Sequence, residues 1–182
     1  MATSRTPRIY VGTYRKYNNF SIEGKWLNLS DYSDREEFYE ACKELHKDGT
    51  DPEFHFQDWE DLPKFMISES SLDECIFDYL EAMEEMDDTR ADAFDIFVKS
   101  VHGSWEGLSQ MQSYFEDSYQ GFYGYGTEDA QMKYTYQYVD DCGYLNGIPE
   151  TVQRYFDYEA FSKDLFISDL DEVDGHIFSK NY

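Results

Sequence analysis

The segment from Leu72 to Asp88, LDECIFDYLEAMEEMDD, holds eight carboxylates and no basic residue. Ser70 and Ser71 precede it and can cap the first turn of a helix. The apolar residues of the segment recur at the spacing of one helix face: Leu72, Ile76, Tyr79 or Leu80, and Met83. The pattern predicts an amphipathic helix with one buried stripe and carboxylates on its remaining faces.

The acidic excess extends beyond this helix and is uneven along the chain. There are 39 acidic and 15 basic residues, a net charge of −24. Up to residue 65 there are 13 acidic and 9 basic residues; from 66 to 100 there are 11 and 2, and from 101 to 182 there are 15 and 4. Salt adaptation usually spreads acidic residues over a whole surface. The concentration after residue 65 therefore favours a functional negative surface over general solubility.

The apolar content is too high for a disordered acidic chain, since 41% of the residues are hydrophobic and 19% are aromatic. Alternating or β-branched and aromatic patterns predict strands over residues 8–14, 24–29 and 52–59. Ser33 and Glu36 form a capping box for a helix that ends at Gly49. We expect an N-terminal antiparallel sheet with one helix.

Pro63 marks a boundary, because proline resists the continuation of either kind of element. We expect an N-terminal α+β domain over residues 1–62, a central acidic helical domain over 63–103 and an acidic C-terminal α+β domain over 104–182. A second central helix over 90–101, capped by Asp88 or Thr89, turns four residues inward: Phe94, Phe97, Val98 and Val101.

The C-terminal part alternates between glycine-rich and helical patterns. The Tyr- and Gly-rich residues 113–126 predict a packed hairpin or loop. A helix begins near Thr127 and ends at Gly143, and residues 148–166 are helical with a break near Asp157. Residues 174–178 close the chain as a strand. The fold class is α+β.

No catalytic or metal-binding motif is present. The four histidines (His46, His55, His102, His176) have no clustered ligand spacing, so packing or surface roles are favoured. The segment DLDEVDG at 169–175 resembles a calcium loop, but Val173 and Lys180 occupy positions that need oxygen ligands. GFYGYG lacks the lysine and the glycine order of a phosphate loop. We expect no catalytic residue, no metal and no cofactor.

The cysteine pattern and the lack of long apolar runs and of clustered basic residues indicate the compartment and the class of partner. Three widely spaced cysteines (Cys42, Cys75, Cys142) suit reduced thiols in a cytoplasm. No run of 18 apolar residues and no signal-peptide pattern occurs, so we expect a cytoplasmic protein without membrane contact. Direct binding of nucleic acid requires clustered Lys and Arg, which are lacking.

The negative field itself then becomes the candidate functional feature. B-form DNA carries one charge per about 1.7 Å of axis, so a dimer with twice the charge of −24 would match about 80 Å of duplex. Carboxylates on successive helix turns lie about 5 to 6 Å apart, near the spacing of phosphates along a strand. DNA mimicry is the sharpest hypothesis. An acidic module for another basic DNA-binding or nucleoid protein is the alternative, and a hydrolase using a carboxylate pair also remains open.

Several segments of the sequence resemble the antirestriction protein ArdA family. They occur in the order of that family and cover essentially the whole chain. They are PRIYVGTYRKYNN, GKWLNLSDY, EEFYEACKELHKD, DPEFHFQDWE, YFDYEAFSKDLF and VDGHIF. The resemblance implies an elongated, dimeric chain of three small domains that is not an enzyme. It further implies DNA mimicry: surface carboxylates would imitate duplex phosphates and occupy the DNA-binding channel of type I restriction–modification enzymes, protecting incoming mobile-element DNA.

The resemblance implies which surfaces matter. The dimer contact would lie in the C-terminal domain around the helix after Thr127, with Tyr134 and Tyr138 as candidates. The segment TEDAQMKYTYQYVDD is richer in tyrosine than the family pattern there, which affects the expected dimer strength. The candidate mimic carboxylates are Asp73, Glu74, Asp78, Glu81, Glu84, Glu85, Asp87, Asp88, Asp92, Asp95, Glu116, Asp117, Glu128, Asp129, Asp140 and Asp141.

Overall fold

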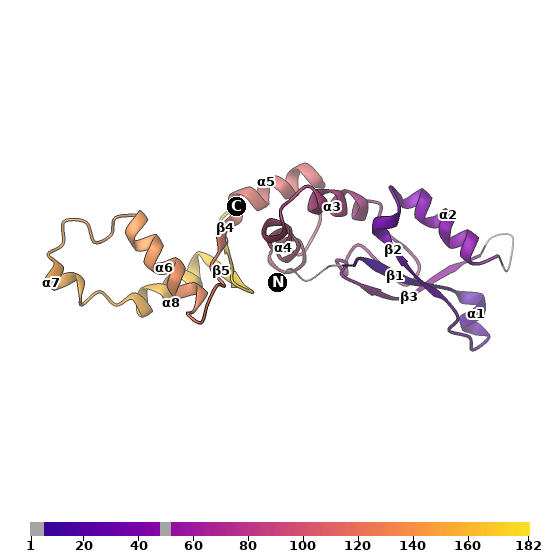
Figure 1. Cartoon of the computed structure of the whole chain (residues 1–182), viewed down its shortest axis with the longest axis horizontal. Coiled ribbons are helices and arrows are strands. Elements are labelled where there is room, and N and C mark those ends of the chain that lie inside the picture. Colours follow the sequence, from indigo (N-terminus) through magenta and orange to yellow (C-terminus); the bar gives the residue numbers. More distant parts are fainter. Residues whose placement is uncertain (1–5, 48–51) are drawn as a thin grey trace. The chain divides into compact units, whose positions relative to one another are not determined.

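The structure is a computed structural model, and it describes residues 6–47 and 52–182 (Figure 1). Small antiparallel sheets and several helices make up the chain, which confirms the α+β class. Two compact units divide it: unit 1 comprises the residues up to Ala91 together with Ser104–Leu108, and unit 2 comprises Asp92–Gly103 and Ser109–Tyr182. The three-domain division with boundaries at 62 and 103 stays a prediction.

Unit 1 is built on a three-stranded antiparallel sheet. Strands β2 (Lys25–Asn28), β1 (Arg8–Thr13) and β3 (Phe54–Glu60) lie in that order, with a register shift between Tyr10 and Val11 of the central strand. All three predicted strands are confirmed. The short helix α1 (Tyr14–Asn18) follows β1, and the 3-10 helix η1 (Leu29–Asp31) follows β2.

Helix α2 (Arg35–Leu45) lies against this sheet (Figure 1), where its Phe38 is 5.9 Å from Phe56 of β3 between ring centroids. The predicted cap is wrong by one residue. The side chain of Asp34, in extended backbone conformation, accepts from the Glu37 amide, while the Ser33 amide and hydroxyl both donate to the Glu37 carboxylate. His46 caps the other end. Gly49, the predicted stop, lies outside the described residues.

Helix α3 (Cys75–Glu84) begins later than its apolar pattern predicts. Ser68 and Ser71 form a turn joined by their hydroxyls, and Leu72 bridges Ile67, so the serines do not cap the helix. Leu72 is buried, but it belongs to this turn rather than to the helical stripe. The buried face of α3 consists of Ile76, Tyr79 and Ala82.

Helix α4 (Asp88–Ile96) continues into η2 (Phe97–His102), a π-helical segment that ends at Gly103 in the left-handed conformation. Phe94, Phe97 and Val98 are buried as predicted, whereas Val101 is half-buried. The wider π-helical turn changes the spacing of side chains after Ile96, so a uniform α-helical period does not apply there.

Unit 2 contains a second antiparallel sheet, β4 (Tyr119–Phe122), β6 (His176–Ser179) and β5 (Leu170–Val173) in that order. The predicted closing strand is confirmed as β6, and Gly175 at positive φ makes the turn between β5 and β6. The prediction of a hairpin or loop for residues 113–126 is wrong over its first half. Helix α5 (Leu108–Ser118) occupies it, because Met111, Phe115 and Ser118 recur at helical spacing and are buried.

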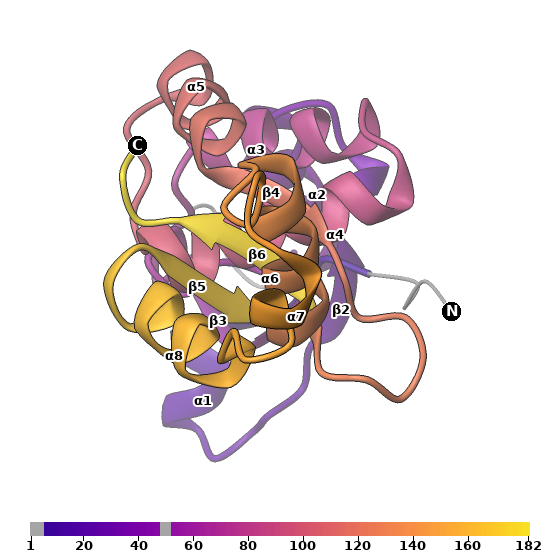
Figure 2. The same ribbon diagram turned by 90° about the vertical axis from the view of Figure 1, so that its left-hand side faces the viewer.

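Helices α6 (Ala130–Asp141), α7 (Glu150–Gln153) and α8 (Tyr158–Ser168) complete unit 2, and Figure 2 shows α8 beside the paired strands β5 and β6. The predicted break at Asp157 is confirmed, since its side chain caps α8 by accepting from the Ala160 amide. The core of this region contains Tyr134, Leu165, Leu170 and Ile177.

Candidate interaction surface

The predicted mimic carboxylates are nearly all on the surface of their own units. Fourteen of the sixteen are exposed; Asp92 is half-buried and Asp95 is buried. In unit 1 the exposed members are Asp73, Glu74, Asp78, Glu81, Glu84, Glu85, Asp87 and Asp88. In unit 2 they are Glu116, Asp117, Glu128, Asp129, Asp140 and Asp141. Each unit therefore presents a negative surface on helices and on their flanking turns.

Helix α3 positions the densest group. Burial of Ile76, Tyr79 and Ala82 orients the helix, so the carboxylates of Asp78, Glu81 and Glu84 remain exposed on its other faces. Residues three and four apart on a helix lie about 5 to 6 Å from one another between Cβ atoms, and like charges at this spacing repel. The carboxylates of α3 therefore repel one another, and their placement lowers the stability of the helix.

Acidic residues also lie at helix C-termini, where negative charge is unfavourable. Asp140 and Asp141 end α6, and no basic residue lies in the last turn of α3, α4, α5 or α6. A helix C-terminus carries partial negative charge, so an anion there costs about 0.3–1 kcal/mol. The acidic end of α6 therefore lowers the stability of this helix.

Three of the exposed carboxylates also cap the backbone. Asp73 accepts from the Cys75 amide at 3.0 Å, Asp87 from the Arg90 amide at 3.0 Å and Asp129 from the Gln131 amide at 3.1 Å. One oxygen of each side chain makes these contacts while the residue stays exposed. Substituting them tests the local fold as well as the surface charge.

Asp95 does not fit a phosphate-imitating role. It is 8% exposed, and its Oδ1 lies 2.6 Å from Nζ of Lys99 one helical turn later. The adjacent Lys99 ammonium offsets the negative charge of this carboxylate within unit 2. Asp95 and Lys99 stand four residues apart, a helical spacing present in the sequence, whereas the burial of the pair comes from the fold.

The two predicted dimer residues lie largely inside unit 2. Tyr134 is 7% exposed within the core of α6, α8, β5 and β6, and its burial raises the pKa of its hydroxyl to about 12. Tyr138 is half-buried and stacks on Tyr134 with ring centroids 5.8 Å apart. A hydrogen bond with Tyr144, followed by burial, raises the pKa of Tyr138 to about 12. Tyr134 has almost no side-chain surface left for a partner.

Other apolar side chains of unit 2 are exposed where the sequence pattern did not single them out. They lie on α6, on α8 and along the segment between these helices: Tyr136, Tyr144, Ile148, Val152, Tyr155 and Ile167. Tyr155 is 87% exposed. The signal in the sequence was the run IPETVQRYF, of whose apolar residues only Val152 lies in the four-residue helix α7.

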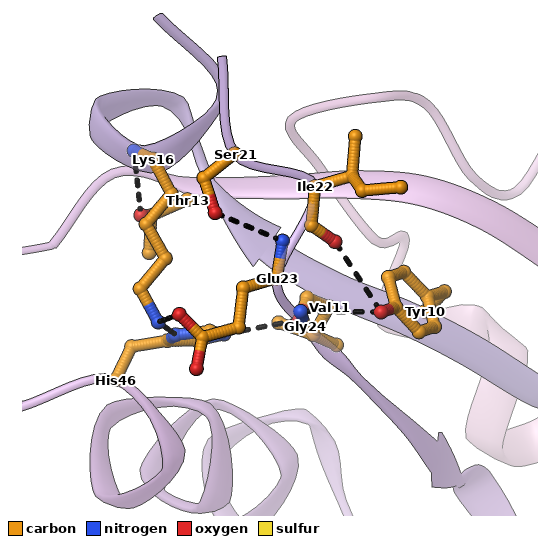
Figure 3. A network of polar contacts seen from close by, with 9 residues as sticks. All are labelled: Tyr10, Val11, Thr13, Lys16, Ser21, Ile22, Glu23, Gly24 and His46. Atoms are coloured by element: carbon orange, nitrogen blue, oxygen red, sulfur yellow. Dashed lines mark hydrogen bonds and ion pairs between the residues drawn. The ribbon is translucent and has the colours of Figure 1, made fainter. Parts of the chain in front are cut away.

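The histidines have packing roles, as expected. Figure 3 shows His46 between the sheet and Lys16: its Nε2 is 3.0 Å from the Val11 carbonyl and its Nδ1 is 3.2 Å from Lys16 Nζ. A carbonyl only accepts and an ammonium only donates, so Nε2 donates to the Val11 carbonyl and Nδ1 accepts from Lys16. His55 stacks on Tyr14 with ring centroids 4.5 Å apart, and His176 contacts the Tyr119 hydroxyl at 3.1 Å.

Within the described residues, no group of three or more His, Cys, Asp or Glu side chains could hold a metal ion. The cysteines are unpaired: Cys42 is buried, which raises the pKa of its thiol to about 12, and Cys142 is exposed. Over residues 6–47 and 52–182 no helix is long and apolar enough to cross a bilayer.

These features define an acidic α+β protein with exposed carboxylates on its helices and on their flanking turns. Comparison with protein families matches residues 9–178 to the antirestriction protein (ArdA) family, and the chain belongs to this family. The family implies an antirestriction function and an interaction with restriction enzymes. Comparison with curated proteins returns no match.

Proposed function

We propose that this chain inhibits restriction as a DNA mimic, with its exposed carboxylates imitating duplex phosphates in the DNA-binding channel of a type I restriction–modification enzyme. The supporting observation is the placement of the charge. Carboxylates follow one another along α3 and end α6, although both arrangements cost helix stability. A surface selected only for solubility would distribute cations into the last helical turns.

Counterion release supplies the driving force. Both the carboxylate surface and a DNA-binding channel hold counterions, and their association releases these ions as DNA binding does. The affinity for the enzyme then falls steeply with salt. The protein binds in place of DNA and catalyses no reaction. It acts in the cytoplasm, where it protects incoming mobile-element DNA.

The proposed form is a homodimer, whose charge would match about 80 Å of duplex. We assign its contact to the exposed apolar residues of unit 2, such as Tyr144, Val152 and Tyr155, instead of to the buried Tyr134. These side chains offer apolar area to a second copy, whereas the carboxylate surfaces of two copies repel one another. Tyr138 contributes by holding Tyr144 in place, since the two rings lie 6.0 Å apart.

A displacement assay tests the mimicry. A purified type I enzyme is loaded with a fluorescent duplex that carries its recognition site, and the protein is added at several salt concentrations. We expect stoichiometric displacement that weakens as salt rises. Unchanged duplex binding at protein excess would exclude DNA mimicry of this enzyme class. Displacement of duplex from an unrelated nucleoid protein with equal affinity would support the acidic-module alternative.

A further inference from the structure

Unit 1 contains a groove of about 590 Å³ between helix α3 and the segment that runs from Leu29 to Glu36. Its lining combines carboxylates with apolar side chains and holds one cation, Arg35. Pockets that bind ligands commonly have volumes of about 300–1,000 Å³, so the groove has room for several side chains of a partner.

The apolar part of the lining comes from both walls. Phe77 and Leu80 of α3 are half-buried, and Leu29 and Tyr32 line the opposite wall. Phe77 follows Ile76 by one residue, which places it about 100° further round the helix than the buried stripe. Phe77 and Leu80 therefore form a second apolar face of α3, directed at the groove instead of at the core of Ile76 and Tyr79.

Carboxylates border this apolar floor on both sides. Helix α3 contributes Glu74, Asp78, Glu81 and Glu84, and the opposite wall contributes Asp34 and Glu36. All six residues are exposed. Imitation of phosphates requires no apolar side chains, so it does not explain Phe77 and Leu80.

We propose that this groove binds a basic amphipathic segment of a partner protein, with apolar side chains on the floor and Lys or Arg side chains on the acidic rim. Amphipathic helices bind apolar grooves through residues spaced by three and four positions, and long basic side chains lay their apolar stems on a floor while their charges reach the rim. The inference rests on the proposed function, which supplies a basic protein as the partner. It adds an apolar contribution that salt does not screen.

The test uses the full chain and two synthetic helical peptides of equal composition and charge. One peptide has its leucines on a single face, and in the other they are scrambled. We expect the amphipathic peptide to bind about tenfold more tightly, with the preference persisting at about 0.5 M salt. Amide chemical shifts should change in residues 29–36 and 74–84. Equal affinities, or shift changes spread over all acidic helices, would overturn the proposal.

Variants separate the two contributions. Leu80→Asn, which removes apolar contact at similar volume, should abolish the tenfold preference. Glu81→Gln with Glu84→Gln keeps the floor and should weaken both peptides; the matched control, Glu44→Gln with Glu53→Gln, changes exposed carboxylates outside the groove. Equal weakening by the groove pair and the control pair would contradict an acidic rim. The double Gln variant remains informative even where Leu80→Asn fails to fold.

Failure of the groove and failure of the proposed function give different results. A protein that displaces duplex from the enzyme but shows no peptide preference retains mimicry and lacks the groove site. A protein that binds the amphipathic peptide at residues 74–84 but leaves the duplex bound supports the groove and contradicts the mimicry. Tighter binding of a duplex oligonucleotide than of either peptide would overturn the groove assignment.

Discussion

The ammonium of Lys99 lies 2.6 Å from the carboxylate of Asp95, and only 25% and 11% of these side chains are exposed. The pair converts one of the acidic residues of α4 from a surface charge into part of the packing of unit 2. Breaking a largely buried pair leaves one charge without its partner. Some acidic residues of this protein therefore stabilise the fold, others form the surface, and Asp73, Asp87 and Asp129 do both.

Asp95→Asn should lower the free energy of unfolding by about 1–3 kcal/mol, because it removes the carboxylate that Lys99 contacts. Inhibition per folded molecule should stay the same. Chemical denaturation gives the stability, and duplex displacement at matched folded concentration gives the inhibition. The control is Glu85→Gln, an exposed site where stability should change by less than about 0.5 kcal/mol. A larger loss of inhibition in Asp95→Asn than in the control would place Asp95 on the binding surface.

Single neutralisations elsewhere should have small effects. An exposed charge contributes under about 1 kcal/mol to an interaction, so Glu81→Gln alone should change inhibition by less than about fivefold. Neutralising six carboxylates along and after α3 should abolish it: Asp78, Glu81, Glu84, Glu85, Asp87 and Asp88. Duplex displacement measures both. Complete loss of inhibition from one substitution in a folded chain would point to a localised site.

The acidic end of α6 predicts a gain in stability. Asp140→Asn with Asp141→Asn should raise the free energy of unfolding by about 0.5–2 kcal/mol, because it removes two anions from a helix C-terminus. Glu159 lies in the first turn of α8, where an anion is favourable, so Glu159→Gln should lower stability. Thermal melting of both variants checks the opposite signs. The same direction of change in both would exclude the dipole explanation.

Salt should stabilise the whole chain. With a net charge of −24, self-repulsion opposes folding, and about 0.15 M salt shortens the Debye length to about 8 Å. The melting temperature should rise between low and moderate ionic strength. Sodium chloride and a neutral osmolyte are compared to separate screening from general exclusion effects. A melting temperature independent of salt would contradict an uncompensated acidic surface.

Alkaline pH should unfold the chain cooperatively. Burial raises the pKa of Cys42 from 9.0 to about 12 and that of Tyr134 from 10.0 to about 12. A folded pKa above the unfolded value stabilises the folded state below the unfolded pKa, and this stability is lost as pH rises from about 9 to about 12. Circular dichroism and tyrosinate absorbance follow the transition. Cys42→Ala should remove the part of the stability loss that comes from ionisation of the buried thiol. Substitution of the exposed Cys142 should leave that part unchanged.

Local patterns predicted much of the fold. The three strands of unit 1, the closing strand and the break at Asp157 followed from alternation, capping and turn residues. The cap of α2 moved to Asp34 because two neighbouring residues could both serve as caps. Helix α5 was missed since Tyr114 and the tyrosines and glycines beyond the helix resemble a loop, while the burial of Met111 and Phe115 that stabilises it comes from distant segments.

The net charge, its concentration after residue 65 and the family follow from residue identity and order and need no folded structure. That Asp95 and Tyr134 are buried and that Phe77 faces a groove follows only from the packing of the folded chain. Burial depends on segments far apart in the chain, such as residues 29–36 opposite 74–84. A helical period specifies a face of a helix, but not what lies against it.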